Sequence, residues 1–310
     1  MTYTQLACGL LLALCTTRAI ATEVCDIPPR YGLSATAQAI VRTTCNEHRL
    51  WYRPFIDRDG RIASLGVTEA ENQSLADEGV IAWQRVAGYW RDSGTLGAMA
   101  TLAGAQSCLA TPGNRYTDSD CRAFLIDHPW SAAFISWVMT RAGVPGFKRS
   151  PRHIDYIRAA YLDGANGPYR LTDPATGKPA PGDMLCFLRN RSSTLSYRGL
   201  IEALGKDRTG NWQSHCEIVV AANAGGDRTL HLIGGNVANT VLMRRMPLDR
   251  TGVMELHLPD AASGLQDCLP GREEECNFNR QDWAALLKLT PQPASTPTPQ
   301  AAAGNGEATH

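Results

Sequence analysis

The spacing of apolar residues changes along the chain, and this change constrains the fold more than any other feature of the sequence. Before residue 180 the apolar residues recur at intervals of three and four, which is typical of helices that bury one face. After residue 180 they alternate or form short runs between turn residues, which is typical of strands. Helices followed by strands predict an α+β domain with an antiparallel sheet.

The helical part divides into two predicted regions. Helices are expected over 35–49 and 69–90, with a turn at 57–60 between them. Residues 22–100 therefore form a helical N-terminal region, either a subdomain or an elaboration packed on the main domain. That main domain is expected over 101–289.

The sheet is expected to follow a further short helix at residues 153–162. Strands are predicted over 184–188, 215–222, 230–235 and 240–245. The polar stretch 190–214 separates the first two strands. A loop of this length is either a functional lid or a surface insertion.

Both ends of the chain are expected to lie outside the folded domain. Residues 1–21 resemble a signal peptide, with an apolar core from Leu6 to Cys15 and the small-residue pattern Ala19-Ile20-Ala21; the alternative is a buried N-terminal helix. Residues 290–310 are rich in Pro, Ala, Thr and Gly, which predicts a disordered tail. The protein is thus expected to be periplasmic or secreted, and no other segment reaches the roughly 20 apolar residues that span a bilayer.

Ten cysteines, of which two lie in the predicted signal peptide, indicate disulfides in an exported chain. Closeness in sequence favours the pairs Cys25–Cys45, Cys108–Cys121 and Cys268–Cys276. Cys186 and Cys216 lie in two predicted strands and can form a fourth bridge if these strands are neighbours. Metal binding is the rival interpretation, but neither a Cys-x-x-Cys pair nor a His-Glu-x-x-His helix is present, and we expect no metal or other cofactor.

Charge and motifs disfavour several classes of function. The chain carries 30 basic and 30 acidic residues, and it lacks the Lys/Arg stripe that marks a nucleic-acid surface. It also lacks the Gly-x-Ser-x-Gly elbow of lipase-type hydrolases and the glycine patterns of nucleotide-binding loops.

Ser131 lies at the start of an apolar helical run in the segment HPWSAAFISWVMTRAGV, residues 128–144. Serine is a favoured N-cap residue, so a capping role is one interpretation. Pro129 favours the other, because proline prefers the first helical position, which makes His128 the cap and places Ser131 in the first turn. At helical spacing Ser131 then shares a face with Ile135 and Val138, where a hydroxyl needs a partner.

Two residues of the predicted strands supply such a partner. His215 opens one strand, and Asn236 follows two glycines at the end of the next. A nucleophile at a helix start, a histidine on a strand and an orienting amide form a set suited to nucleophilic catalysis, with helix N–H groups receiving an oxyanion. We therefore predict that Ser131, His215 and Asn236 are catalytic; the alternatives are a core histidine and a turn asparagine.

Five further residues are predicted to line the substrate site, although each also fits an ordinary packing or surface role. They are Trp130, His153, Asp155, Arg189 and Glu217.

The order of these motifs resembles a known group. The first motif is a tryptophan followed by the nucleophile position and Ala-Ala-Phe-x-Ser-Trp-Val. Pro-Gly-Asp before a strand comes next, and it is followed by a strand that begins with His and a strand that bears Asn. This order resembles the papain-like amidases and peptidases of bacterial walls, the CHAP and NlpC type. The stretches PWSAAFISWVM, PGDMLC, HCEIVV and IGGNV are similar to the uncharacterised bacterial family called domain of unknown function 2272, over roughly residues 100 to 260.

This resemblance implies a papain-like fold with a helix that carries the nucleophile, and activity on amide or peptide bonds of peptidoglycan. Wall amidases of this type carry cysteine where this chain has Ser131. A serine hydroxyl ionises far more weakly than a thiol, so Ser131 would depend wholly on His215. The chain is therefore either a serine-dependent hydrolase or an inactive domain that binds a wall peptide or a protein partner. An adhesin or scaffold role is a third option.

Overall fold

The computed structural model describes residues 23–28, 32–69, 71–77, 79–189, 194–256 and 277–291. The predicted signal peptide, the pair Cys268–Cys276 and the predicted tail from residue 292 onward lie outside these residues.

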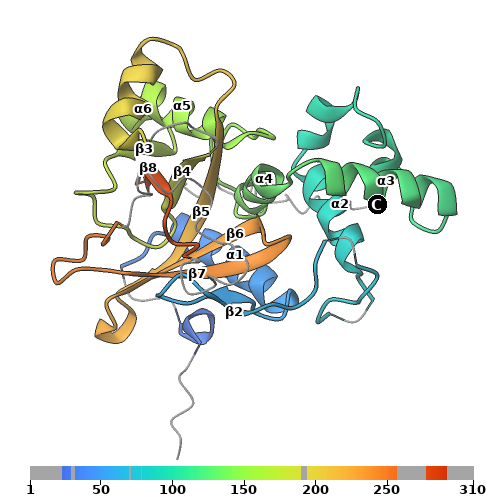
Figure 1. Ribbon diagram of the computed structural model, residues 1–310, viewed down its shortest axis with the longest axis horizontal. Helices are drawn as coiled ribbons and strands as arrows, with labels where there is room; N and C mark the ends of the chain where they lie inside the picture. The colour runs from blue at the N-terminus through green and yellow to red at the C-terminus, as the bar shows by residue number, and fades with distance from the viewer. Residues whose placement is uncertain are drawn as a thin grey trace, which may run out of the picture.

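An eight-stranded sheet forms the centre of the described structure, in the order β2-β1-β7-β6-β5-β4-β8-β3 (Figure 1). Neighbouring strands are antiparallel except β1 and β7, which are parallel. The strands are β1 Phe55–Ile56, β2 Ile62–Ser64, β3 Tyr169–Thr172, β4 Met184–Arg189, β5 Gln213–Ala222, β6 Thr229–Val237, β7 Thr240–Pro247 and β8 Asp282–Leu289. The predicted mixed α+β class is confirmed, and the four predicted strands correspond to β4, β5, β6 and β7.

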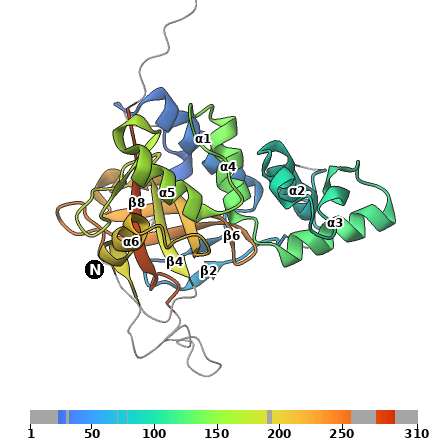
Figure 2. The ribbon, with the colours of Figure 1, turned by 90° about the horizontal axis from the view of Figure 1, so that it is seen from above.

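Six α-helices lie within the described residues: α1 Ala35–Leu50, α2 Ala82–Asp92, α3 Arg115–Asp127, α4 Ser131–Arg141, α5 His153–Asp163 and α6 Ser196–Gly205. Short 3-10 helices are η1 Val24–Asp26, η2 Thr95–Met99, η3 Gln106–Leu109, η4 Gly164–Asn166 and η5 Ala224–Gly226. Helices α1, α4 and α5 lie beside the sheet, whereas α2 and α3 form a lobe to one side (Figure 2). Helix α4 joins the two parts, since it contacts α2 as well as β5 and β6.

The alternation of side chains divides β5 between two hydrophobic clusters. Successive strand residues point to opposite faces of a sheet. Ile218 packs in the main core with the helices, while Val219 belongs to a second cluster that contains Phe187 and Trp283. His215 and Glu217 share the face of Val219, because they lie two and four residues away from it along the strand.

The N-terminal region differs from the expectation of two long helices. Residues 55–56 and 62–64 form strands, and β1 pairs with β7, so this region contributes to the sheet. Helix α2 begins at Ala82 rather than at residue 69. Backbone hydrogen bonds outside the helix explain why α2 starts late. The Glu69 N–H donates to the Asn239 carbonyl over 2.9 Å, and the Leu75 N–H donates to the Val80 carbonyl over 2.8 Å.

The polar stretch 190–214 contains helix α6, which the sequence analysis had assigned to a loop. A carboxylate from β8 caps this helix. Asp282 accepts hydrogen bonds from the backbone N–H groups of Leu195 (2.9 Å) and Ser196 (2.8 Å). These groups are among the donors that a helix start leaves unsatisfied, so α6 is fixed to the sheet.

Three of the four predicted disulfides are present, and the fourth lies outside the described residues. They are Cys25–Cys45, Cys108–Cys121 and Cys186–Cys216. Cys186 and Cys216 face each other directly across β4 and β5, one register position from Phe187 and His215. The third bridge therefore joins the strand that carries His215 to its neighbour.

Replacing Cys186 and Cys216 together with alanine is expected to lower the free energy of unfolding by about 2–4 kcal/mol, the usual range for a native disulfide. Urea denaturation gives this quantity. The matched control is the double replacement of Cys108 and Cys121, whose bridge spans 13 residues against 30. Because loop-closure entropy grows with length, the control is expected to lose less stability; equal stability of the wild type and the Cys186/Cys216 variant would contradict the prediction.

Candidate functional site

Ser131 is the first residue of α4, and the N-cap residue is Trp130. The capping interpretation of Ser131 is therefore wrong, and its placement in the first turn is confirmed. The expected cap, His128, instead ends α3. Ser131 is buried, with 7% of its surface exposed, and the next three residues of α4 are buried as well. Its hydroxyl thus lies in a largely buried position at the start of a helix.

The hydroxyl of Ser131 is hydrogen-bonded to a histidine. Its Oγ lies 2.8 Å from Nε2 of His153, the first residue of α5. The starts of two helices therefore meet at this bond. Burial, followed by the neighbouring His215 and Arg189, holds the pKa of His153 well below its usual range. A neutral imidazole with its proton on Nδ1 accepts the serine hydroxyl through Nε2.

The imidazole ring of His215 packs against that of His153. The two imidazole centroids are 5.1 Å apart, and the ring of Phe187 packs 5.2 Å from His215 on another side. Nε2 of His215 is 3.5 Å from Oε1 of Glu217. Within the described residues neither ring nitrogen makes a hydrogen bond, so His215 contacts the histidine partner of Ser131 rather than the hydroxyl. Burial lowers the pKa of His215 to about 4.

Glu217 and Arg244 form a buried ion pair behind the two histidines. Arg244 donates from Nε and Nη2 to both carboxylate oxygens of Glu217, over 2.9 to 3.1 Å. Burial opposes ionisation of Glu217, but Arg244 and His215 outweigh it and hold the pKa of the carboxyl at about 2. Arg244 is fixed in turn by Asn279 Oδ1 at 3.1 Å. A continuous series of contacts therefore runs from the Ser131 hydroxyl to an ionised carboxylate inside the sheet.

Two glycines of β6 make room for this arrangement. A Cβ on Gly234 would lie 2.8 Å from Cγ of Glu217 and 3.0 Å from Nε2 of His215. A Cβ on Gly235 would lie 2.6 Å from Phe134 of α4. Gly234 therefore leaves room for Glu217 and His215 on one face of β6, and Gly235 leaves room for α4 on the other face.

Asn236 is placed against the start of α4. With its amide oriented to satisfy its neighbours, its oxygen accepts the Trp130 backbone N–H over 3.1 Å, and its nitrogen donates to Glu69 (3.3 Å) and to Asn239 (3.2 Å). None of these contacts is to His215. The expected contact between Asn236 and the histidine is therefore replaced by one that positions the helix carrying Ser131.

Trp130 and Glu217, predicted to line the substrate site, are both fully buried. The indole Nε1 of Trp130 donates to Glu69 over 2.5 Å, and the ring stacks 5.9 Å from Trp51. Neither Trp130 nor Glu217 can contact a substrate in this conformation, so both support the site from behind. Trp130 packs among apolar rings and Glu217 is ion-paired, and these contacts hold both side chains inside the protein.

Asp155 and Arg189 occupy different positions around the site. Asp155 accepts from Ser150 Oγ at 2.5 Å and from Arg152 at 2.8 Å, and so fixes the turn before α5. Arg189 ends β4 and is exposed, with its guanidinium carbon 5.1 Å from the centre of the Phe187 ring. The structure thus brings Ser131, His153, His215, Glu217 and Arg189 into one series and places Asp155 beside it.

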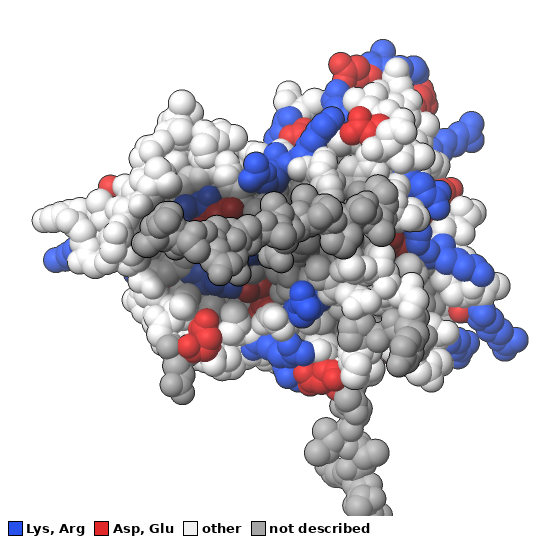
Figure 3. All heavy atoms as spheres, turned by 180° about the vertical axis from the view of Figure 1, so that it is seen from behind, with Lys and Arg blue, Asp and Glu red and all other residues white. Residues whose placement is uncertain are grey.

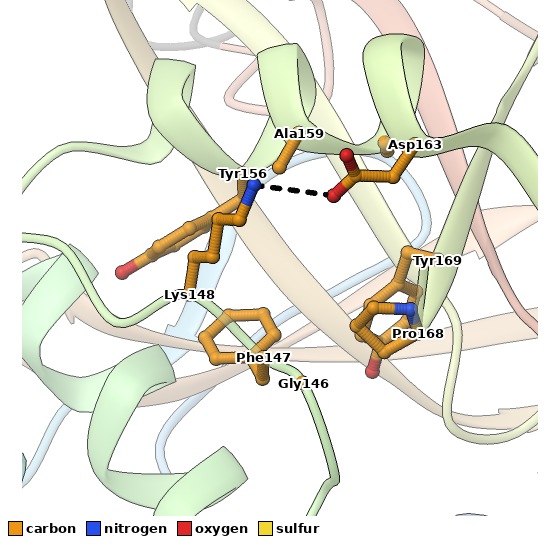
Figure 4. A pocket seen from close by; sticks show the side chains of 9 residues that line it. Gly146, Phe147, Lys148, Tyr156, Ala159, Asp163, Pro168 and Tyr169 are labelled. Atoms are coloured by element: carbon orange, nitrogen blue, oxygen red, sulfur yellow. Dashed lines mark ion pairs between the residues drawn. The ribbon is translucent and has the colours of Figure 1, made fainter. Parts of the chain in front are cut away.

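A separate small pocket lies between α5 and β3. The rings of Phe147, Tyr156 and Tyr169 line it, and the ion pair between Lys148 and Asp163 (3.3 Å) lies beside them (Figure 4). None of the predicted site residues lines this pocket. The Tyr156 hydroxyl points away from it and donates to the Ala132 carbonyl of α4 over 2.7 Å.

The described residues show neither a metal site nor a helix able to span a membrane. In the described part of the chain, no group of three or more His, Cys, Asp or Glu residues is arranged to hold a metal ion. Among the described helices, none combines the length and apolar character needed to cross a bilayer. On the face opposite to that of Figure 1, Lys and Arg lie among Asp and Glu rather than in one patch of a single sign (Figure 3).

The fold and the site define an α+β protein in which a serine at a helix start is hydrogen-bonded to a histidine at the start of another helix. The chain belongs to the family described as uncharacterized protein conserved in bacteria (DUF2272), whose model matches residues 77–289. No curated protein and no solved structure matches it. The family assignment made from the motifs is confirmed, and the match leaves α1, β1 and β2 outside.

Proposed function

We propose that this protein is an exported hydrolase of papain-like type that uses Ser131 as its nucleophile and cleaves amide or peptide bonds of peptidoglycan. The observation that carries the proposal is the 2.8 Å hydrogen bond between Ser131 Oγ and His153 Nε2. A hydroxyl paired with a neutral imidazole is the arrangement that activates a serine.

The chemistry follows from this pair. His153 takes the hydroxyl proton as Oγ attacks the substrate carbonyl, and N–H groups at the start of α4 stabilise the resulting oxyanion. The imidazolium then protonates the leaving amine, which departs and leaves an acyl-serine. Water attacks this ester with His153 again as the base, and the acid product is released as the proton returns to Ser131.

His215 is a positioning residue in this scheme. Its ring packs against His153, and the Glu217 carboxylate lies 3.5 Å behind it. Sequence analysis assigned the role of base to His215. The contact with Ser131 favours His153 for that role.

Substrate and compartment are supported by indirect observations. Three disulfides within the described residues fit an oxidising compartment. The predicted signal peptide gives a route to it. The resemblance of the motifs to wall amidases supports peptidoglycan as the source of the amide or peptide bond.

A second candidate is an inactive domain that binds a wall peptide or a protein partner. The observation that favours it is burial, since Ser131 is 7% exposed and His153 3% exposed. In this case the serine–histidine bond stabilises the packing of α5 on α4 and no covalent step occurs.

Labelling with a fluorophosphonate distinguishes the two candidates. An activated serine attacks phosphorus and displaces fluoride, so the wild-type protein is expected to gain one adduct at Ser131, located by peptide mass spectrometry. Ser136→Ala is the matched control, because Ser136 lies on the same helix but bonds Tyr156 instead of a histidine (2.7 Å). The control is expected to be labelled and Ser131→Ala to remain unlabelled.

Two negative results together would contradict the proposed hydrolase. An unlabelled wild type that also releases no product from purified peptidoglycan would favour the binding domain. Ser131→Cys adds a further reading, because a thiol beside His153 at a helix start is expected to react rapidly with iodoacetamide, whereas a merely structural position would hold an inert thiol.

A further inference from the structure

We propose that Arg189 binds a carboxylate group of the substrate beside the Ser131–His153 pair, so that the preferred substrates are peptides with a free carboxylate near the scissile bond. This inference rests on the proposed function and deepens it by assigning a substrate class.

The register of the sheet places Arg189 next to the histidines. Arg189 is opposite Gln213, and Phe187 is opposite His215, so Arg189 and His215 are diagonal neighbours on one face. The guanidinium carbon lies 5.1 Å from the centre of the Phe187 ring, which itself packs 5.2 Å from His215. Arg189 is also close enough for its charge to lower the pKa of His153.

Among the described residues, no acidic side chain forms an ion pair with the guanidinium of Arg189. Among the described residues it has neither an ion pair nor a hydrogen bond, although the acidic Glu217 lies nearby. Glu217 is already bound by Arg244. Other arginines around the site are paired, as Arg152 is with Asp155 and Arg158 with Asp207. An unneutralised cation that is exposed at the end of a strand is available to an anion from solution.

The surroundings favour a carboxylate as that anion. Guanidinium groups are planar forks that match carboxylates through two parallel hydrogen bonds, and they remain ionised even when burial lowers their pKa. Stacking over Phe187 holds the fork in one orientation, which reduces the entropy lost on binding. Three ring nitrogens nearby make no hydrogen bond within the described residues, namely Nδ1 of His153 and both nitrogens of His215. Buried polar atoms of this kind are normally satisfied by a ligand or by water.

The test compares two activated esters that differ in charge. The probes are p-nitrophenyl butyrate, which is neutral, and mono-p-nitrophenyl glutarate, whose acyl chain ends in a carboxylate. We expect wild-type kcat/KM to be about 10- to 100-fold higher for the glutarate, the range that one charge-assisted pair supplies. Arg189→Met is expected to bring the ratio of the two kcat/KM values close to one, and Arg189→Lys to give an intermediate ratio, because lysine keeps the charge and loses the fork.

Arg141→Met is the matched control. Arg141 also lies over an aromatic ring, that of Trp137 at 5.5 Å, but it ends α4 at the opposite end from Ser131. It is expected to keep the wild-type ratio. A wild-type ratio near one, or a ratio that Arg189→Met leaves unchanged, would overturn the inference while leaving a Ser131-dependent hydrolase intact.

A binding measurement decides the case in which neither ester is turned over through Ser131. Isothermal titration of the Ser131→Ala protein compares acetyl-alanyl-alanine with its C-terminal amide. Binding of the acid at least 10-fold more tightly, with the difference lost in Arg189→Met, supports the carboxylate site even though the hydrolase has failed. Equal binding of acid and amide would overturn it.

Discussion

Replacing His153 with alanine is expected to reduce kcat on peptidoglycan or an activated ester by about 10⁶-fold, the scale of losing the serine or the histidine of a catalytic unit. His153 is the residue whose Nε2 contacts Ser131 Oγ. Ser131→Ala is expected to lose as much, and the double variant no more, because the two residues act as one unit. Steady-state kinetics of the three variants provide the measurement.

His215 is expected to behave differently because it acts through His153. His215→Asn should lower kcat less than His153→Ala does, and it should also move the pH profile. Since His215 contributes to the low pKa of His153, its removal is expected to raise that pKa and shift the acidic limb of kcat/KM to higher pH. If instead His215→Asn abolishes turnover and His153→Ala preserves it, His215 is the base.

The second large effect is acid unfolding. Burial lowers the pKa of His48, His215 and His231 to about 4 each, and it holds the pKa of His153 well below its usual range. In the unfolded chain these groups titrate near 6.5. The folded state therefore keeps its full stability above that pH and loses it progressively as the pH falls, because only the unfolded chain takes up these protons.

Each such histidine contributes a slope of about 1.4 kcal/mol per pH unit, so four approach 5 kcal/mol per unit near pH 5. A domain near the lower end of ordinary stability, about 5–15 kcal/mol, is then expected to unfold between about pH 4 and pH 6. Raised pKa values of the buried carboxyls of Glu69 and Asp183 oppose the trend in part.

Urea denaturation at pH 7, 6 and 5 measures this slope. His231→Phe removes one of the four titrations and is expected to reduce the slope by about a quarter while keeping the ring buried. A free energy of unfolding that stays constant between pH 7 and pH 5 would show that these histidines are not held neutral.

The central strands could be predicted because their residues alternate or are uniformly apolar. Strand β8 could not, since its sequence DWAALLKL is rich in residues that favour helices. Pairing with β4 on one side and β3 on the other overrides that preference. Strands β1 and β2 were missed because two or three residues are too short to show a period.

Part of the candidate site could also be predicted from the sequence. A hydroxyl on the apolar face of α4 required a partner, and a histidine was expected. Which histidine it is depends on how α5 packs over α4, and no local spacing encodes that packing. The Glu217–Arg244 pair left a trace in the sequence, because each is a charged residue inside an otherwise apolar strand, HCEIVV and TVLMRRM. Charges in such strands are rarely buried without a partner.

The position of β8 has a consequence for biosynthesis. The last described strand lies inside the sheet, between β4 and β3, so β4 is paired on one edge only, with β5, until residues 282–289 have been synthesised. A nascent chain that ends before them exposes the backbone groups of two strands, and the long-range pairing makes completion slow. The sheet therefore closes only after residue 289 has left the ribosome.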